Sequence, residues 1–248
     1  MRLYNAHFEL IAKAKAPGGT EPLFARFSPD GKRVAVGFKN TTAVNLLSGV
    51  DNGDLSIVEW SRDGQRLYAA GKYYDESNRQ SVRIWENGGK GSYRDVPIAD
   101  NTVFDLAALS DGGLTFGTAD PAIGVLSASD AERWVRRPEI ADFRDNHEGF
   151  QASFDGGTIR FAYRQWGEAP AVFSLAERRI LEEVEDASLH PPRTKAPGLD
   201  IQGWKYTTNP TLNGAPLPLK KHEMSRSVAI APDGEHFFAR YGMVPALL

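Results

Sequence analysis

The 248-residue sequence contains no cysteine. This absence excludes disulfides, thiolate metal sites and a thiol nucleophile. There is also no run of 18 apolar residues, so no membrane-spanning helix is predicted. The N-terminus, Met1–His7, lacks the apolar stretch and the small-residue cleavage site of a secretory signal. We therefore expect a cytoplasmic protein that does not bind a membrane.

The chain also lacks a large excess of positive or negative charge. The chain has 29 basic and 32 acidic residues, with a net charge of −3. Such a balance provides no broad basic field for phosphate backbones, so we do not expect nucleic-acid binding. No segment of 11–18 residues has a helical period, and the sequence therefore predicts an all-β protein.

What the sequence does contain is a repeat. Five segments share a β-rich run, an Asp-Gly pair and a second β-rich run. The pairs are Asp30-Gly31, Asp63-Gly64, Asp111-Gly112, Asp155-Gly156 and Asp233-Gly234. An Asp-Gly pair between two apolar runs predicts a hairpin, because glycine takes the positive φ of the turn. Two of the intervals between these pairs match the roughly 40–45 residues of a four-stranded propeller blade.

Two motifs carry a resemblance to the WD40 and related propeller families. Ser28-Pro29-Asp30-Gly31-Lys32 resembles the first hairpin turn of such blades, and Val82-Arg83-Ile84-Trp85 resembles the end of the third strand. The resemblance implies an all-β β-propeller of WD40-like four-stranded blades. With about five blade signatures we expect an incomplete or open propeller that forms a single domain over residues 1–248.

A narrower resemblance lies toward the C-terminus. Trp204–Gly214 and Met224–Gly234 are similar to the WD40 region of bacterial caspase-like peptidases, and Gly49–Gly53 and Ile98–Thr102 point the same way. Those longer proteins pair a propeller with a catalytic domain that needs a Cys-His pair. Because this chain has no cysteine, the resemblance implies the propeller without the peptidase activity.

Several regions depart from the repeat. The first blade lacks room for a fourth strand before Asp51, and the last ends after a second strand at His236–Phe238. We interpret Phe8–Lys13 as an outer strand of a blade that is otherwise missing, and Ala239–Leu248 as a frameshifted tail on a truncated gene or a natural irregular C-terminus. Prolines at 189–218 predict an irregular insertion with one or two short strands. Open sheet edges predict self-association.

The sequence shows no catalytic constellation. The five histidines are scattered without a His-Glu-x-x-His pair, and there is no Gly-x-Ser-x-Gly elbow. We expect no metal, no cofactor and no enzyme activity, although an acid pair of the glycosidase type stays open. The aspartates of the five Asp-Gly pairs are interpreted as turn formers.

One recurrence suggests a binding face. An Asp-Asn pair precedes the hairpin turn in three blades: Asp51-Asn52, Asp100-Asn101 and Asp145-Asn146. The loops after the second strands return to the same face and contribute Tyr74, Arg164 and Trp166 among others. Carboxylates, amides and loop aromatics are the side chains of a recognition surface. The alternative is that the aspartates only cap backbone amides and recur because the blade recurs.

Three functions are compatible with this sequence. The leading hypothesis is a non-catalytic protein-interaction scaffold, a truncated regulatory propeller of a caspase-like peptidase, that binds an unidentified protein partner. The second is a propeller hydrolase that acts on a glycan, lactone or peptide. The third is a truncated relic without a function of its own.

Overall fold

The computed structural model describes residues 2–14, 22–38, 42–43, 56–119, 122–130, 133–136, 151–153, 157–162, 170–181, 198–200, 211–218 and 223–243. Within these ranges every regular element is a strand. No helix there has the length and apolar character needed to cross a membrane.

The strands form six antiparallel sheets. Three four-stranded sheets follow the chain: β6 (Ile57–Trp60), β7 (Leu67–Ala70), β8 (Gln80–Trp85) and β9 (Tyr93–Ala99); β10 (Val103–Ala108), β11 (Leu114–Thr118), β12 (Ala122–Leu126) and β13 (Arg133–Arg136); β14 (Gln151–Ala152), β15 (Thr158–Ala162), β16 (Pro170–Ser174) and β17 (Arg179–Leu181). Two sheets have three strands: β3 (Pro22–Phe27), β4 (Val34–Phe38) and β5 (Thr42–Ala43); β18 (Leu199–Asp200), β19 (Thr211–Leu212) and β20 (Ala215–Pro216). The sixth combines β1 (Arg2–Asn5), β2 (Leu10–Lys13), β21 (Glu223–Ile230) and β22 (His236–Met243).

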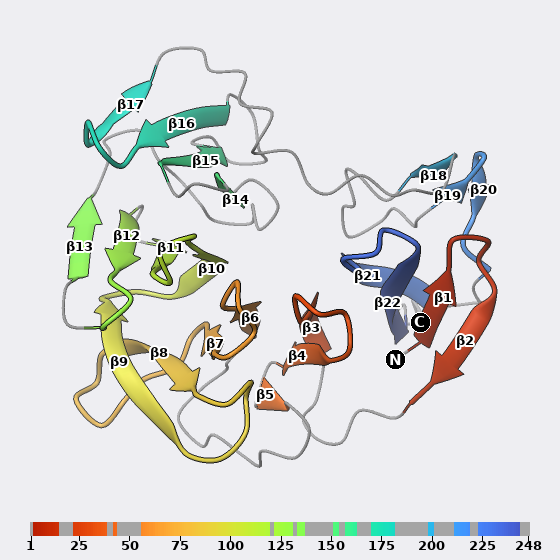
Figure 1. Cartoon of the computed structure of the whole chain (residues 1–248), viewed down its shortest axis with the longest axis horizontal. Helices are drawn as coiled ribbons and strands as arrows, with labels where there is room; N and C mark the ends of the chain where they lie inside the picture. Colours follow the sequence, from red (N-terminus) through yellow and green to blue (C-terminus); the bar gives the residue numbers. More distant parts are fainter. Residues whose placement is uncertain are drawn as a thin grey trace, which may run out of the picture.

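The six sheets lie around a common centre, as the blades of a propeller do (Figure 1). The first strand of a blade is innermost: β3 packs beside β21 on one side and β6 on the other, and β6 packs beside β10. The prediction of an all-β propeller is confirmed. The propeller is incomplete in the part of the chain that the structure describes, because the sheets of β3–β5 and β18–β20 have three strands each.

The sixth sheet is assembled from both ends of the chain. Its order is β2-β1-β22-β21, and β1 pairs with β22 from Arg2 opposite Ala239 to Asn5 opposite His236. Phe237 stacks on Tyr4 with ring centroids 5.4 Å apart, and Phe8 approaches the same ring edge-on at 5.6 Å. The outer strand predicted within Phe8–Lys13 is therefore present as β2, but its blade is not missing. β1 and the C-terminal strands β21 and β22 supply the rest of it.

The Asp-Gly hairpins form as the sequence predicts. Gly31, Gly64, Gly112 and Gly234 have φ values of 69°, 68°, 87° and 69°. In the first, the Gly31 amide donates to the Ser28 carbonyl at 2.8 Å, while Asp30 accepts from the Ser28 hydroxyl and the Lys32 amide. These aspartates are turn formers in each hairpin described, and Asp155 lies outside the described residues.

Apolar side chains fill the seams between neighbouring blades. Val82 and Ile84 of β8 pack against the blade of β10–β13, in a cluster with Leu106 and Phe116. On its other side the blade of β6–β9 buries Trp60 and Trp85, in a cluster with Ala35 of β4. Both tryptophans are fully enclosed in this seam, at 3% and 2% exposed.

Two segments differ from the prediction. The proline-rich region at 189–218 contains three two-residue strands within its described part, not one or two. At the C-terminus β22 does not stop at Phe238. It continues to Met243, which pairs with Glu223 of β21. A long partner strand in β21 makes this extension possible.

Candidate functional site

Antiparallel strands give each blade two distinct faces. The turn face carries the Asp-Gly turns and the β8–β9 connection, whereas the loop face carries the β7–β8 and β9–β10 connections. Of the predicted site residues, Tyr74, Asp100 and Asn101 are described, and all three lie on the loop face. The remaining predictions, Asp51, Asn52, Asp145, Asn146, Arg164 and Trp166, lie outside the described residues.

The β7–β8 connection is a small hairpin organised by Asp75. Its Oδ1 accepts hydrogen bonds from the Ser77 amide at 2.9 Å, the Ser77 hydroxyl at 2.6 Å and the Arg79 amide at 3.0 Å. The other oxygen, Oδ2, accepts from the Ser81 hydroxyl at 2.6 Å. Asn78 takes a φ of 58°, which closes the turn. One carboxylate therefore fixes the whole loop, while Glu76, Ser77 and Asn78 at its tip stay exposed.

The environment of Asp75 favours its charged form. Burial alone would raise the pKa of this carboxyl. The hydrogen bonds from Ser77 and Ser81 and from the backbone amides outweigh burial, and the pKa lies below its ordinary value. The loop is thus held by an ionised carboxylate at neutral pH.

The two predicted loops meet through an ion pair. The Arg79 guanidinium lies 3.1 Å from the Asp100 carboxylate, and the side chains are 40% and 61% exposed. Next to it, Asn101 Oδ1 accepts the Thr102 amide at 2.8 Å. In this Asp-Asn pair the asparagine caps the backbone, and the aspartate reaches across to the hairpin of β7–β8.

Sequence reasoning missed Gln80, which lies directly beneath these loops. Its backbone pairs with that of Tyr74 on one side and with that of Ala99 on the other. The Gln80 side chain is 1% exposed, yet neither its amide nitrogen nor its amide oxygen has a hydrogen-bond partner. One signal was available: Gln80 takes the same strand face as Val82 and Ile84, where an apolar residue is expected.

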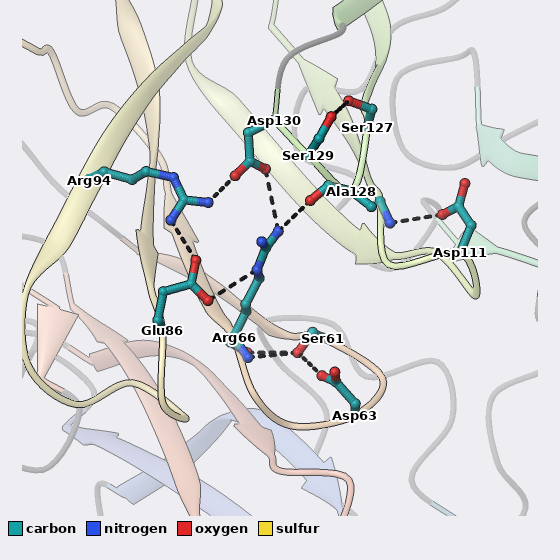
Figure 2. Close-up of polar contacts among 11 residues, drawn as sticks. Ser61, Asp63, Arg66, Glu86, Arg94, Asp111, Ser127, Ala128, Ser129 and Asp130 are labelled. Carbon is teal, nitrogen blue, oxygen red and sulfur yellow. Dashed lines mark hydrogen bonds and ion pairs between the residues drawn. The ribbon is translucent and has the colours of Figure 1, made fainter.

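The turn face is different in character, because its charges pair with one another. Arg66 and Arg94 alternate with Glu86 and Asp130 in a closed ring of ion pairs (Figure 2). Arg66 lies 3.2 Å from Glu86 and 3.6 Å from Asp130, and it donates to the Ala128 carbonyl at 2.8 Å. The hydrogen bond from Arg94 is the main cause that lowers the pKa of Glu86. This ring ties the blade of β6–β9 to the β12–β13 connection.

An equivalent arginine, Arg33, joins the β3–β5 blade to the β6–β9 blade. Arg33 follows its Asp-Gly pair at the same offset as Arg66, and it donates to the carbonyls of Gly88 at 2.9 Å and Gly64 at 3.2 Å. Its guanidinium also lies over the Trp60 ring, 4.7 Å from the centroid. We call Arg33 and Arg66 the latch arginines. Their contacts with carbonyls and carboxylates hold neighbouring blades together on the turn face.

A third polar cluster is internal. Arg83 binds Asp95 through two nitrogens, each at 2.8 Å, and Tyr73 donates to the same carboxylate at 2.6 Å. Burial is the main cause that raises the pKa of Tyr73. Tyr73 is 4% exposed and packs in the core. Its neighbour Tyr74 is half-buried and is the aromatic side chain available on this loop.

The metal-ligating and titratable side chains of the described residues are spread over the fold. Among the described residues no group of three metal-ligating side chains comes together. The sheet of β2, β1, β22 and β21, called the composite sheet from here on, carries the described histidines: His7 in the β1–β2 turn and His236 in β22, where His236 pairs with Asp233 at 2.7 Å. The loop face offers fixed donors, acceptors and one aromatic, which are groups that recognise a ligand.

Comparisons with known proteins support the fold alone. No model of a protein family matches the sequence, and no curated protein matches it. Among solved structures the chain is similar to the WD40 repeats of RRP9, with a TM-score of 0.53, 18% identity, and coverage of 69% of this chain and 52% of that one. It is also similar to the β-propeller domain of Cps50 (Swd1) from Myceliophteria thermophila, with a TM-score of 0.52, 14% identity, and coverage of 75% and 62%.

A further similar structure is an enzyme, the dihydro-heme d1 dehydrogenase NirN in complex with DHE. Its TM-score is 0.52 at 16% identity, with 73% of this chain and 40% of that chain covered. The chain thus spans less than two thirds of the length of each of these structures. The likeness establishes a WD40-like β-propeller, and function has to be argued from the site.

Proposed function

We propose that this propeller is a protein-interaction module that binds its partner through the loop face of the β6–β9 blade. The observation that carries the proposal is the hairpin fixed by Asp75. A loop whose backbone is already ordered loses little conformational entropy when a partner binds. Tyr74 beside the loop adds an aromatic side chain of the kind enriched at binding hot spots.

The contrast with the turn face supports this choice of surface. On the turn face the latch arginines and the ring of Arg94, Glu86 and Asp130 satisfy one another. On the loop face Glu76, Ser77 and Asn78 extend into solvent from a fixed turn. A partner on the loop face can therefore bind without breaking the contacts of the latch arginines.

The test is partner capture with two matched variants. Tyr74→Ala on the loop face and Lys90→Ala on the turn face each remove one side chain outside the core. Cross-linking in cells followed by mass spectrometry should recover a partner with the parent protein and with Lys90→Ala, and lose it with Tyr74→Ala. Equal capture by Tyr74→Ala, or no specific partner with the parent protein, contradicts the proposal.

The relation to caspase-like peptidases is a separate proposal. It is supported by the motifs at Trp204–Gly214 and Met224–Gly234 in the sequence. Under it, the interaction module is the regulatory propeller of a longer parent protein. Sequencing the coding DNA beyond codon 230 tests it: a second reading frame that encodes more blades or a Cys-His domain is the expected result, and the lack of one contradicts it.

A further inference from the structure

The unpartnered amide of Gln80 is an exception to a general rule. Buried polar groups in folded proteins almost always have hydrogen-bond partners, because an unpaired one loses its hydration without compensation. Gln80 leaves both its donor and its acceptor without a partner at 1% exposure. Apolar neighbours on the same strand face, Val82 and Ile84, are fully buried, so an apolar residue would suit the position for stability.

Gln80 is also the residue of β8 nearest the proposed binding face. Tyr74, Gln80 and Ala99 are register neighbours across three adjacent chain segments, so their side chains share one face of the blade. Arg79 and Asp100, which flank Gln80 and Ala99 in sequence, form the ion pair at the surface end of this row. Arg79 Nε is itself buried without a partner. Three unsatisfied polar atoms therefore cluster beneath the loops of the proposed binding face.

We propose that Gln80 reads a primary carboxamide, the side chain of an asparagine or glutamine presented by the partner. This inference rests on the proposed function and names the chemistry that the site recognises. A primary carboxamide has an N–H on the same side as its carbonyl oxygen, so it accepts from Gln80 and donates to Gln80 in one planar pair. A backbone amide has these groups on opposite sides, and a carboxylate has no donor.

Entry to the site requires Arg79 and Asp100 to separate. Both side chains are well exposed, and exposed ion pairs contribute little to stability. Once released, Arg79 offers its unpaired Nε to the incoming carbonyl oxygen, while Asp100 offers an acceptor to the second N–H of the carboxamide. The three unpaired atoms of Arg79 and Gln80 then each have a partner in the complex.

The test uses acetamide as the probe, with acetate and N-methylacetamide as matched controls. Nuclear magnetic resonance titration should show saturable shifts at Tyr74, Arg79, Gln80 and Asp100 with acetamide. Neither control should reproduce them. Gln80→Met, which keeps the shape and removes both polar atoms, should abolish the shifts and raise the melting temperature, because it removes an unsatisfied buried amide.

Three results overturn the inference: no response to acetamide, an equal response to either control, or an ordered water that satisfies Gln80 and is not displaced by acetamide in a crystal structure. A fall in the melting temperature of Gln80→Met likewise contradicts it. Partner capture is measured separately. If Gln80→Met keeps the partner while Tyr74→Ala loses it, the carboxamide site fails and the proposed function stands.

Discussion

The β6–β9 blade and the composite sheet have the same number of strands but are built in different ways. The blade uses one continuous segment, Ile57–Ala99, in the order of the chain. The composite sheet brings β1 and β2 from the N-terminus to β21 and β22 from the C-terminus. The first depends on turns between neighbours in sequence, whereas the second depends on contacts between residues more than 200 positions apart.

Because of this difference, the two sheets stabilise the protein in different ways. The blade gains from local order: an Asp-Gly turn, the hairpin fixed by Asp75 and the buried Arg83–Asp95 pair. The composite sheet holds the two ends of the chain together, with Phe237 between Tyr4 and Phe8. Local contacts form at small entropic cost, and long-range ones need closure of the whole chain. The composite sheet is therefore the part whose loss affects every blade.

The largest effect should come from removing residues 1–14. Without β1 and β2, the composite sheet loses half its strands, and the β22 edge and the Phe237 ring are uncovered. We expect loss of the cooperative thermal transition and self-association, seen by calorimetry and size-exclusion chromatography. The control is a circular permutant that begins at residue 22 and carries residues 2–14 after Met243 on a linker. It should restore the transition, and an unchanged deletion variant contradicts the account.

Replacing one buried aromatic residue in each region tests the comparison further. Phe237 in the composite sheet and Phe116 in β11 are 1% and 0% exposed. Replacing either by alanine should cost about 3–5 kcal/mol in the free energy of unfolding. Urea titration measures both. If Phe237→Ala costs no more than a surface substitution, then Tyr4 and Phe8 do not pack on this ring, and the composite sheet is wrong.

The ion-pair ring of the blade should have a smaller effect. Arg66→Ala leaves Glu86 and Asp130 with Arg94 alone, and it removes the hydrogen bond to the Ala128 carbonyl. We expect a loss of about 1–2 kcal/mol, which falls as salt rises because part of the ring is exposed. Lys90→Ala on the same face serves as the control and should have little effect. A salt-independent loss contradicts the electrostatic origin.

The smallest expected effect is a change in how the stability of the protein depends on pH. The hydrogen bond from Ser61 is the main cause that lowers the pKa of Asp63. The hydrogen bond from Arg94 does the same for Glu86. A carboxyl with a lowered pKa in the folded state contributes stability above its unfolded pKa, near 4, and loses it as the pH falls through the folded value. Stability should therefore fall with acid below about pH 5. Glu86→Gln should flatten this slope in acid titrations monitored by fluorescence, and an unchanged slope contradicts the assignment.

The comparison also explains what the sequence could predict. Asp-Gly turns are local signals, so the hairpins at Asp30, Asp63 and Asp233 followed from residue type alone. Pairing of Arg2 with Ala239 could not be predicted in the same way, because no local pattern encodes a partner at the other end of the chain. The strand in Phe8–Lys13 was identified, but its sheet was not.

The candidate site shows the same limit. Tyr74 and Asp100 could be assigned to one face from the alternation of strands, which is a topological argument. The Arg79–Asp100 pair and the burial of Tyr73 depend on side-chain packing across loops. The alternation with Val82 and Ile84 places Gln80 on an apolar strand face, but its burial and its lack of partners follow only from the packing.

The central claim is that the two ends of the chain share one sheet, and an engineered disulfide tests it most directly. Arg2 and Ala239 are paired in adjacent antiparallel strands, where Cα atoms lie about 4.5–5.5 Å apart, within the range of a disulfide. The chain has no cysteine, so in Arg2→Cys with Ala239→Cys the intended bond is the one disulfide that can form within a molecule. We predict a fast-migrating, intramolecularly cross-linked monomer on non-reducing gels and a higher melting temperature. Free thiols or only intermolecular bonds after mild oxidation would contradict the account.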